Sequence, residues 1–270
     1  CDVDNQRPSA PNLFVFAYDW RQDNLATIEL LADYVTCVRR FFPGARVNLL
    51  THSMGGLVAR RYILSRTPEH RVQRMVTMVA PWLGAPKLIH VLETGDFLDE
   101  INKLPFGAEG IKADLRYAVE SFPAAHQLLP SLHWFTNGGP PPLEEEDAQD
   151  YDGNGIIDES FDSYERLVAA VNAAHPGYSI GSTNALFHDF STGVGDQDFL
   201  QPDDTGVKYF HLTGSQLLPA TITKVLVRRV VTCGLLPGAN RCTWRRVYEP
   251  VLGPGDGTVP MLSQSPWGEG

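Results

Sequence analysis

Residues 47–58 read VNLLTHSMGGLV, and this stretch decides how the fold is interpreted. A short apolar strand runs into a sharp turn that carries Ser53, and a helix begins directly after the turn. Gly56 lets the backbones of helix and strand approach each other, while a side chain at Gly55 would crowd the turn. The stretch therefore predicts a strand–turn–helix unit with one serine at its turn.

This unit matches the nucleophile elbow of the α/β-hydrolases, in which a strained turn lifts a serine hydroxyl above the edge of a sheet. We predict that Ser53 is a nucleophile and that the backbone N–H of Met54, at the start of the helix, stabilises an oxyanion. One departure is Thr51, which stands where the first glycine of the G-x-S-x-G pattern is usual. The alternative is an ordinary serine between a strand and a helix.

The composition is that of a globular protein, with 43% hydrophobic residues and a net charge of −10. No run of eighteen apolar residues predicts a transmembrane segment. The acidic balance argues against nucleic acid as a partner and against a polybasic membrane anchor. Four cysteines permit disulfides at Cys233–Cys242 and Cys1–Cys37, although Cys37 also fits a place in a helical core. We expect an extracellular or exported protein.

Strands and helices alternate in the first eighty residues. The apolar run at 13–18 predicts a strand that is buried on both faces of a parallel sheet. Apolar residues at spacings of 3 and 4 predict a helix over 24–42, and a further buried strand is predicted over 72–80. This β-α-β-α-β series predicts an α/β fold, namely a doubly wound, mostly parallel sheet.

The composition changes after Pro81, where proline, glycine and aspartate become frequent. We interpret this region as a cap or lid inserted into the core, with short amphipathic helices around 85–94 and 162–174. A core strand resumes at 207–213, and two β-rich stretches flanking the Cys233–Cys242 loop predict a hairpin. The predicted division is a first core part, an inserted cap and a second core part, over residues 1–81, 82–205 and 206–270.

The second chemical element is GPGDGTVP at residues 253–260. In hydrolases of this fold the triad acid comes from a loop after a late strand and follows the serine in the chain. We predict that Asp256 is this acid, which would orient a histidine and stabilise its imidazolium form. The alternative is that Asp256 and Gly257 only form a turn.

A third element, DYDGNGIID at residues 150–158, fits the first nine positions of a calcium-binding loop. Position twelve is Phe161, where a bidentate glutamate would be usual. The alternative is an acidic turn in a surface loop; if calcium is bound, we expect it to brace the cap and not to activate water. The predicted ligands are Asp150, Asp152, Asn154, the carbonyl of Ile156, and Asp158.

Five motifs occur in order along nearly the whole chain: FAYDWR at 16–21, THSMGG at 51–56, APWLGAPK at 80–87, SFPAAHQLLPS at 121–131 and GDGTVP at 255–260. In these motifs the chain resembles the lecithin:cholesterol acyltransferase family, which includes lysosomal phospholipase and phospholipid:diacylglycerol acyltransferase. The resemblance implies an α/β-hydrolase that moves acyl groups from lipid esters through a serine acyl-enzyme. It implies Ser53 as nucleophile, Asp256 as triad acid, and a lipid ester at a membrane or lipoprotein-like surface as substrate.

The chain departs from the family pattern in its histidines, because all eight precede Asp256 while the family's triad histidine follows it. We expect that histidine, and the strand that gives the second oxyanion donor, to lie outside this chain, as in a domain clipped at both ends. His211, on the late core strand, is a weaker candidate for the same role. Asp19 and Arg21, beside the expected active-site mouth, also fit a simple ion pair.

Two other functions remain open. One is a catalytically inactive hydrolase-like domain that binds calcium, which the missing histidine favours. The other is a carboxylesterase for small esters or a peptidase on the same fold, which the motifs around Trp82 and Leu129 argue against.

Overall fold

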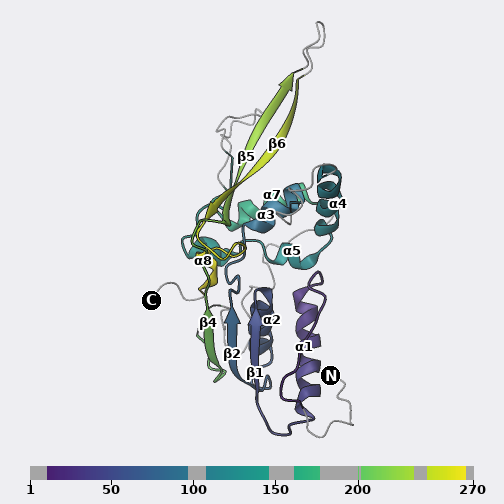
Figure 1. Ribbon diagram of the computed structural model, residues 1–270, viewed down its shortest axis with the longest axis vertical. Coiled ribbons are helices and arrows are strands. Elements are labelled where there is room, and N and C mark those ends of the chain that lie inside the picture. The colour runs from purple at the N-terminus through teal and green to yellow at the C-terminus, as the bar shows by residue number, and fades with distance from the viewer. Residues whose placement is uncertain are drawn as a thin grey trace.

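The computed structural model describes residues 11–96, 108–145, 161–176, 200, 202–233 and 242–265. Within these ranges the strands form two three-stranded sheets, with the orders β1-β2-β4 and β3-β5-β6. The first sheet lies at one end of the molecule beside α1 and α2, and the second sheet rises from the other end as a long arm (Figure 1). Among the described residues, no helix is both long enough and apolar enough to cross a membrane.

The core sheet consists of β1 (Val47–His52), β2 (Val72–Met78) and β4 (Lys208–Leu212), which all run parallel. Parallel neighbours need a crossover, and α2 (Met54–Ser65) provides it between β1 and β2. The chain returns to this sheet at β4 only after the long predicted cap. The predicted α/β fold with a parallel sheet is confirmed.

Helix α1 (Asn24–Arg39) begins at Asp23, whose carboxylate accepts a hydrogen bond from the N–H of Leu25 at 2.8 Å. Its apolar side chains at spacings of 3 and 4 are buried against α2, which packs on β1 and β2. This layer covers one face of the core sheet. The helix ends earlier than predicted, since Phe42 lies in a turn beyond it.

The other face of the core sheet is exposed in the described part of the chain. Side chains of β1 alternate between half-buried and exposed, and Leu50 is 68% exposed. Phe210 and Leu212 on β4 are also exposed. Among the described helices, none covers this face.

The predicted strand at 13–18 was wrong, because this segment is not assigned to a strand and Leu13 and Val15 are 79% and 78% exposed. The carbonyl of Val15 accepts a hydrogen bond from Tyr34 of α1 at 2.8 Å. A cavity of about 670 Å³ lies between this segment and β1, the edge strand, so the segment does not pair with the sheet.

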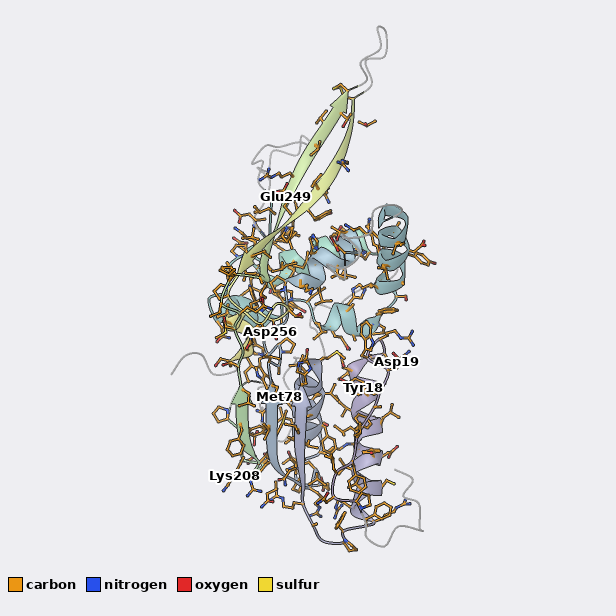
Figure 2. The ribbon with its side chains drawn as sticks, in the orientation of Figure 1. Tyr18, Asp19, Met78, Lys208, Glu249 and Asp256 are labelled. Carbon is orange, nitrogen blue, oxygen red and sulfur yellow. A yellow bond between two sulfur atoms is a disulfide. The ribbon has the colours of Figure 1, made fainter. Side chains whose placement is uncertain are left out.

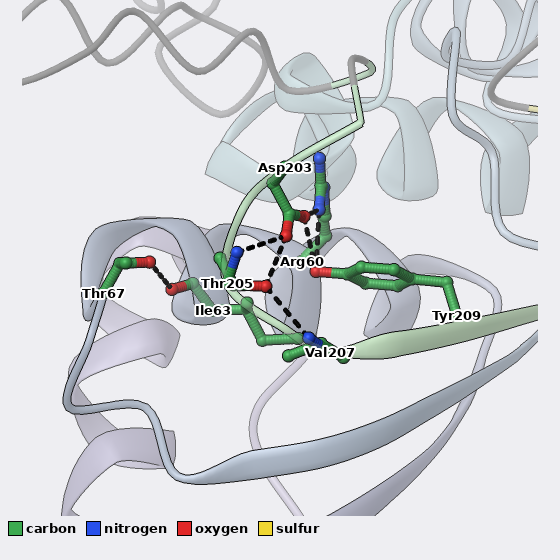
Figure 3. Close-up of polar contacts among 7 residues, drawn as sticks. All are labelled: Arg60, Ile63, Thr67, Asp203, Thr205, Val207 and Tyr209. Atoms are coloured by element: carbon green, nitrogen blue, oxygen red, sulfur yellow. Dashed lines mark hydrogen bonds and ion pairs between the residues drawn. The ribbon is translucent and has the colours of Figure 1, made fainter.

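A buried ion pair fixes the return of the chain to the core sheet (Figure 3). Arg60 of α2 bonds to Asp203 and, at 2.7 Å, to the hydroxyl of Tyr209, which donates to Asp203 at 2.8 Å. The side chains of Arg60 and Asp203 are 3% and 1% exposed. Burial opposes ionisation of Asp203, but hydrogen bonds from Thr205 and the charge of Arg60 hold its pKa below the usual value.

The predicted cap contains the helices α3 (Lys87–Thr94), α4 (Ala108–Glu120), α5 (Pro123–Gln127), α6 (Leu132–Thr136) and α7 (Tyr164–Ala174) and the short strand β3 (Leu143–Glu145). Helices α3 and α7 agree with the two amphipathic helices that the sequence predicts. His175 joins three of these helices, because its ring nitrogens lie 3.1 Å from Glu93 and 2.5 Å from Glu120. The cap thus has its own hydrophobic and polar centre.

The predicted hairpin is confirmed as β5 (Thr221–Cys233) and β6 (Cys242–Gly253), which pair antiparallel. The disulfide Cys233–Cys242 closes its outer end. Cys37 is also disulfide-bonded, and Cys1, its predicted partner, lies outside the described residues. The domain boundaries remain a prediction, but β5 pairs with β3 and not with the core sheet, so within 206–270 only β4 joins the core sheet among the described strands.

Candidate active site

Ser53 occupies the turn between β1 and α2 with backbone angles of φ 51° and ψ −131°. A positive φ is costly for any residue with a Cβ, and such strain persists only where the surrounding structure enforces it. The N–H of Ser53 donates to the carbonyl of Met78, at the end of β2, at 2.9 Å. Its hydroxyl makes no capping hydrogen bond to the helix. The turn therefore presents a strained serine whose hydroxyl is not used to cap α2.

The glycines after Ser53 differ in their steric role. A Cβ at Gly56 would lie 2.6 Å from the Cβ of Ala80, so this glycine is needed for the close approach of helix and sheet. A Cβ at Gly55 would meet nothing nearer than 3.8 Å, from Thr51 and the hydroxyl of Tyr18. The predicted role of Gly56 is confirmed, and the predicted crowding at Gly55 was wrong.

Met54 is the first residue of α2, and its side chain is buried. The N-terminus of a helix carries unpaired N–H groups and a partial positive charge. Met54 follows Ser53 directly, so its N–H is one of the donors at the start of α2 that have no partner within the helix. Its role as an oxyanion donor remains a prediction.

Asp256 follows β6 by three residues and is held in a tight loop. Its Oδ1 accepts hydrogen bonds from the backbone N–H groups of Thr258, at 2.8 Å, and Val259, at 2.7 Å. The N–H of Gly257 donates to the hydroxyl of Thr221 at 2.7 Å. These bonds fix one carboxylate oxygen and leave Oδ2 without a hydrogen bond from the described residues.

Ser53 and Asp256 lie at the same edge of the core sheet. A Cβ built on Gly214, two residues after β4, would lie 3.7 Å from the Cβ of Asp256 and 3.3 Å from Val79, which follows β2. Ser53 follows β1 at this carboxyl edge. Figure 2 shows Asp256 beyond the Met78 end of the strands, with Lys208 at the opposite end. The predicted nucleophile and the predicted acid, from distant parts of the chain, therefore lie at the same edge of the core sheet.

The Asp256 loop is clamped by α8 (Met261–Gln264), which no sequence pattern predicted. The side chain of Gln264 donates to the carbonyl of Gly214 at 2.9 Å and accepts from its N–H at 2.7 Å. The hydroxyl of Ser263 donates to the carbonyl of Gly84 at 2.6 Å and accepts from the N–H of Leu83 at 3.0 Å. Both side chains are almost fully buried, and no periodic pattern in so short a segment could have indicated their role.

Asp19 and Arg21 form a two-pronged ion pair at 2.8 and 2.7 Å on the surface, as the simpler interpretation predicted. The hydrogen bonds from Arg21 hold the pKa of Asp19 well below its usual value. Burial raises the pKa of the neighbouring Tyr18. Neither charged residue has a role that the geometry of Ser53 requires.

Among the described histidines, none bonds to Asp256, whose carboxylate accepts only backbone hydrogen bonds. Nδ1 of His211 lies 2.9 Å from the hydroxyl of Thr77 within the core sheet, one residue before the strand ends. Burial and then the charge of Arg60 lower the pKa of His211 to about 4. His52 lies on the exposed side of β1, and His188 lies outside the described residues.

The calcium loop predicted at 150–158 lies outside the described residues. Elsewhere, within the ranges that the structure describes, no group of three or more histidine, cysteine, aspartate or glutamate side chains is arranged to hold a metal ion. Calcium therefore remains a prediction from the sequence.

The chain is similar to a known protein family. The sequence model of the family "Lecithin:cholesterol acyltransferase" matches residues 9–152. The protein "Lecithin-cholesterol acyltransferase-like 4" of Arabidopsis thaliana is 35% identical over 81 residues, which cover 28% of this chain and 15% of that protein. This chain thus spans only a small part of the curated relative that it matches.

Two solved structures share a weaker likeness. A chain in "The crystal structure of Tle4-Tli4 complex" is 20% identical, with a TM-score of 0.48, and the match covers 91% of this chain and 57% of that chain. The mature lipase BlEst2 of Bacillus licheniformis is 19% identical, with a TM-score of 0.26, and the match covers 39% and 45%. Likenesses at this level assign no property to the chain.

Proposed function

Because the chain belongs to the lecithin:cholesterol acyltransferase family, within the α/β-hydrolase superfamily, we propose that Ser53 accepts an acyl group from a lipid ester and passes it to water or to an alcohol. The observation that supports this most strongly is the strained turn at Ser53. It stands at the N-terminus of α2, at the same sheet edge as Asp256.

In the proposed reaction, Oγ of Ser53 attacks the ester carbonyl carbon while its proton passes to an imidazole. The negative charge that forms on the carbonyl oxygen is stabilised by the N–H of Met54. The tetrahedral intermediate then expels the alcohol part of the lipid, which takes up the proton, and an acyl-enzyme remains. Water or an acceptor alcohol attacks this ester and releases the acyl group.

Asp256 would orient that imidazole through Oδ2, since Oδ1 is already held by two backbone N–H groups. A carboxylate in this position fixes the tautomer and stabilises the imidazolium that forms. The histidine itself is not found among the described residues.

The disulfide-bonded cysteines support an exported or extracellular location, since disulfides persist in oxidising compartments. A lipid ester presented at a membrane or lipoprotein-like surface is the proposed substrate. The apolar residues Trp82 and Leu83, which follow β2, are buried in the hydrophobic cluster that joins the core sheet to α1 and α2, so they do not line an open acyl path.

The proposal is tested by measuring release of fatty acid from phospholipid vesicles and its transfer to a long-chain alcohol. Ser53→Ala should abolish both products. Asp256→Asn keeps an oxygen for the loop hydrogen bonds but loses the charge, so it should lower kcat by about 10⁴ with little change in Tm. Full activity in either variant would overturn the proposal.

The absence of a described histidine beside Asp256 favours a second candidate, a catalytically inactive hydrolase-like domain that binds calcium. A small-ester carboxylesterase is a third candidate. A series of p-nitrophenyl esters separates them, since the lipid enzyme prefers long acyl chains, the carboxylesterase prefers short ones, and the inactive domain turns over none.

A further inference from the structure

The outer part of the β5–β6 hairpin, residues 228–233 and 242–247, stands away from the rest of the molecule (Figure 1). The inner residues Val225 and Val227 are buried in the cap. From residue 228 outward, every residue of β5 whose side chain is described is exposed. A two-stranded hairpin on its own is only marginally stable, and here the disulfide Cys233–Cys242 closes its end. An arm braced in this way contributes nothing to the core and is available for binding.

The arm is cationic in a chain whose net charge is −10. Its strands carry Arg228, Arg229, Arg245 and Arg246, and no acidic residue occurs within 228–233 or 242–247. The acidic neighbours lie at its base: Glu249 is 3.2 Å from Arg228, and Glu145 is 3.9 Å from Arg246.

Three of these arginines have side chains that are exposed to solvent, namely Arg228, Arg245 and Arg246. The side chains of Arg228 and Arg246 are 44% and 46% exposed despite their acidic neighbours. Arg245 is exposed and makes no ion pair with a described residue.

Valines lie opposite two of these arginines across the strand pair. In the strand register Val230 pairs with Arg245 and Arg228 pairs with Val247. Val230 and Val231 are 39% and 59% exposed. Arginines beside exposed aliphatic side chains are suited to the surface of a lipid bilayer. The guanidinium groups can bind headgroup phosphates, while the aliphatic groups enter the boundary of the acyl chains.

We propose that the arm docks the protein on an anionic lipid surface. Each arginine near such a surface adds to binding, and the attraction is screened by salt. The outer six residues of a strand extend about 20 Å, whereas charges are screened over about 8 Å in physiological salt. The arm is therefore longer than the screening length. When its outer end touches an anionic surface, the negatively charged remainder of the protein stays too far away to be repelled.

This inference deepens the proposed function, because β6 leads within three residues to Asp256 and thus links the docking arm to the catalytic edge. Docking itself does not need the serine chemistry. It can therefore be measured with the Ser53→Ala protein, so that a failure of docking and a failure of catalysis are distinguishable.

The experiment is co-sedimentation of Ser53→Ala protein with vesicles of phosphatidylcholine alone or with added phosphatidylglycerol, at low and high salt. Binding is expected only to the anionic vesicles and should weaken with salt. Adding Arg228→Gln and Arg245→Gln should weaken it about 30-fold. Matched substitutions of exposed arginines in the body, Arg40→Gln and Arg74→Gln, should leave it unchanged.

A second variant, Val230→Ser with Val231→Ser, should also weaken binding while far-UV circular dichroism stays unchanged. The proposal is overturned if anionic vesicles are not bound, or if the body variant weakens binding as much as the arm variant. It is also overturned if duplex DNA binds with the same affinity and the same dependence on Arg228 and Arg245, since the arm would then be a nucleic-acid site.

Discussion

Ser53 and Gly56 show how single residues shape the elbow. Ser53 accepts an unfavourable φ because the sheet and the helix on either side fix its turn. Gly56 has no side chain because Ala80 occupies the space. Strain at one residue and close contact at another are thus the local conditions for presenting the hydroxyl.

Replacing Gly56 by alanine should destabilise the fold by about 1–3 kcal/mol, because its Cβ would lie 2.6 Å from the Cβ of Ala80. Gly55→Ala is the matched control. Its Cβ has 3.8 Å of room, and alanine is the better helix former, so stability should stay equal or rise slightly. The free energy of unfolding of the two variants can be measured in urea. Equal destabilisation by the two substitutions would contradict the steric explanation.

At the scale of elements, the sequence predicts best what is local. The elbow, α3 and α7 were predicted because periodicity and turn residues act within a few positions. The segment 13–18 was predicted wrongly, since an apolar run does not reveal whether a pairing partner is beside it. The hairpin was predicted from its cysteines, but its pairing with β3, some eighty residues earlier, left no local signal.

The contact between α2 and the segment before β4 should depend on its buried ion pair. Arg60→Met or Asp203→Asn leaves a buried charge without its counter-ion and should cost about 3–5 kcal/mol in urea unfolding. The control is Arg166→Met, which breaks the exposed pair with Asp162 and should cost less than about 1 kcal/mol. A similar loss of unfolding free energy on breaking either ion pair would show that burial does not determine how much such a pair contributes.

The cap should lose stability as the pH rises, because of His175. The hydrogen bond between His175 and Glu93 raises the pKa of His175. Burial lowers this pKa, but a second hydrogen bond, to Glu120, raises it further, so that the net shift is upward. A histidine whose pKa is higher in the folded than in the unfolded protein stabilises the fold. This contribution is complete below the unfolded-state pKa of about 6.5, and it is lost as the pH rises through the folded-state pKa.

Glu93 acts in the opposite direction. Burial opposes its ionisation, but hydrogen bonds from His175 and Tyr248 lower its pKa, so its contribution is lost in acid. Stability from this cluster should therefore be greatest near pH 5–6, between the unfolded values of the two groups, and should fall as the pH rises through the raised pKa of His175. His175→Gln should remove this fall, whereas substitution of the exposed His52 should not. An unchanged pH slope in His175→Gln would contradict the assignment.

At the scale of the whole molecule, the candidate site is an assembly of distant segments. The order of serine and acid along the chain could be read from motifs, and the structure brings both to one sheet edge. The clamp by Ser263 and Gln264 could not be predicted, because hydrogen bonds between residues 50 and 180 positions apart follow no spacing rule. The histidine partner is not predicted from any local pattern in this chain.

Calcium would act on the cap if the loop at 150–158 binds it. Removal of calcium with a chelator should then lower the Tm of the wild-type protein. Asp152→Ala removes one predicted ligand, so its Tm should already be low and should not respond to the chelator. An identical change in Tm on adding the chelator to the two proteins would show that this loop does not bind calcium.

The central claim is that the hydroxyl of Ser53 is the acyl-accepting nucleophile. The most direct measurement is labelling of the complete protein with a fluorophosphonate, followed by mass spectrometry of the modified peptide. The account predicts one phosphonylated residue, Ser53, and no labelling of Ser53→Ala. A label on a different serine, or equal labelling of the two proteins, would contradict it.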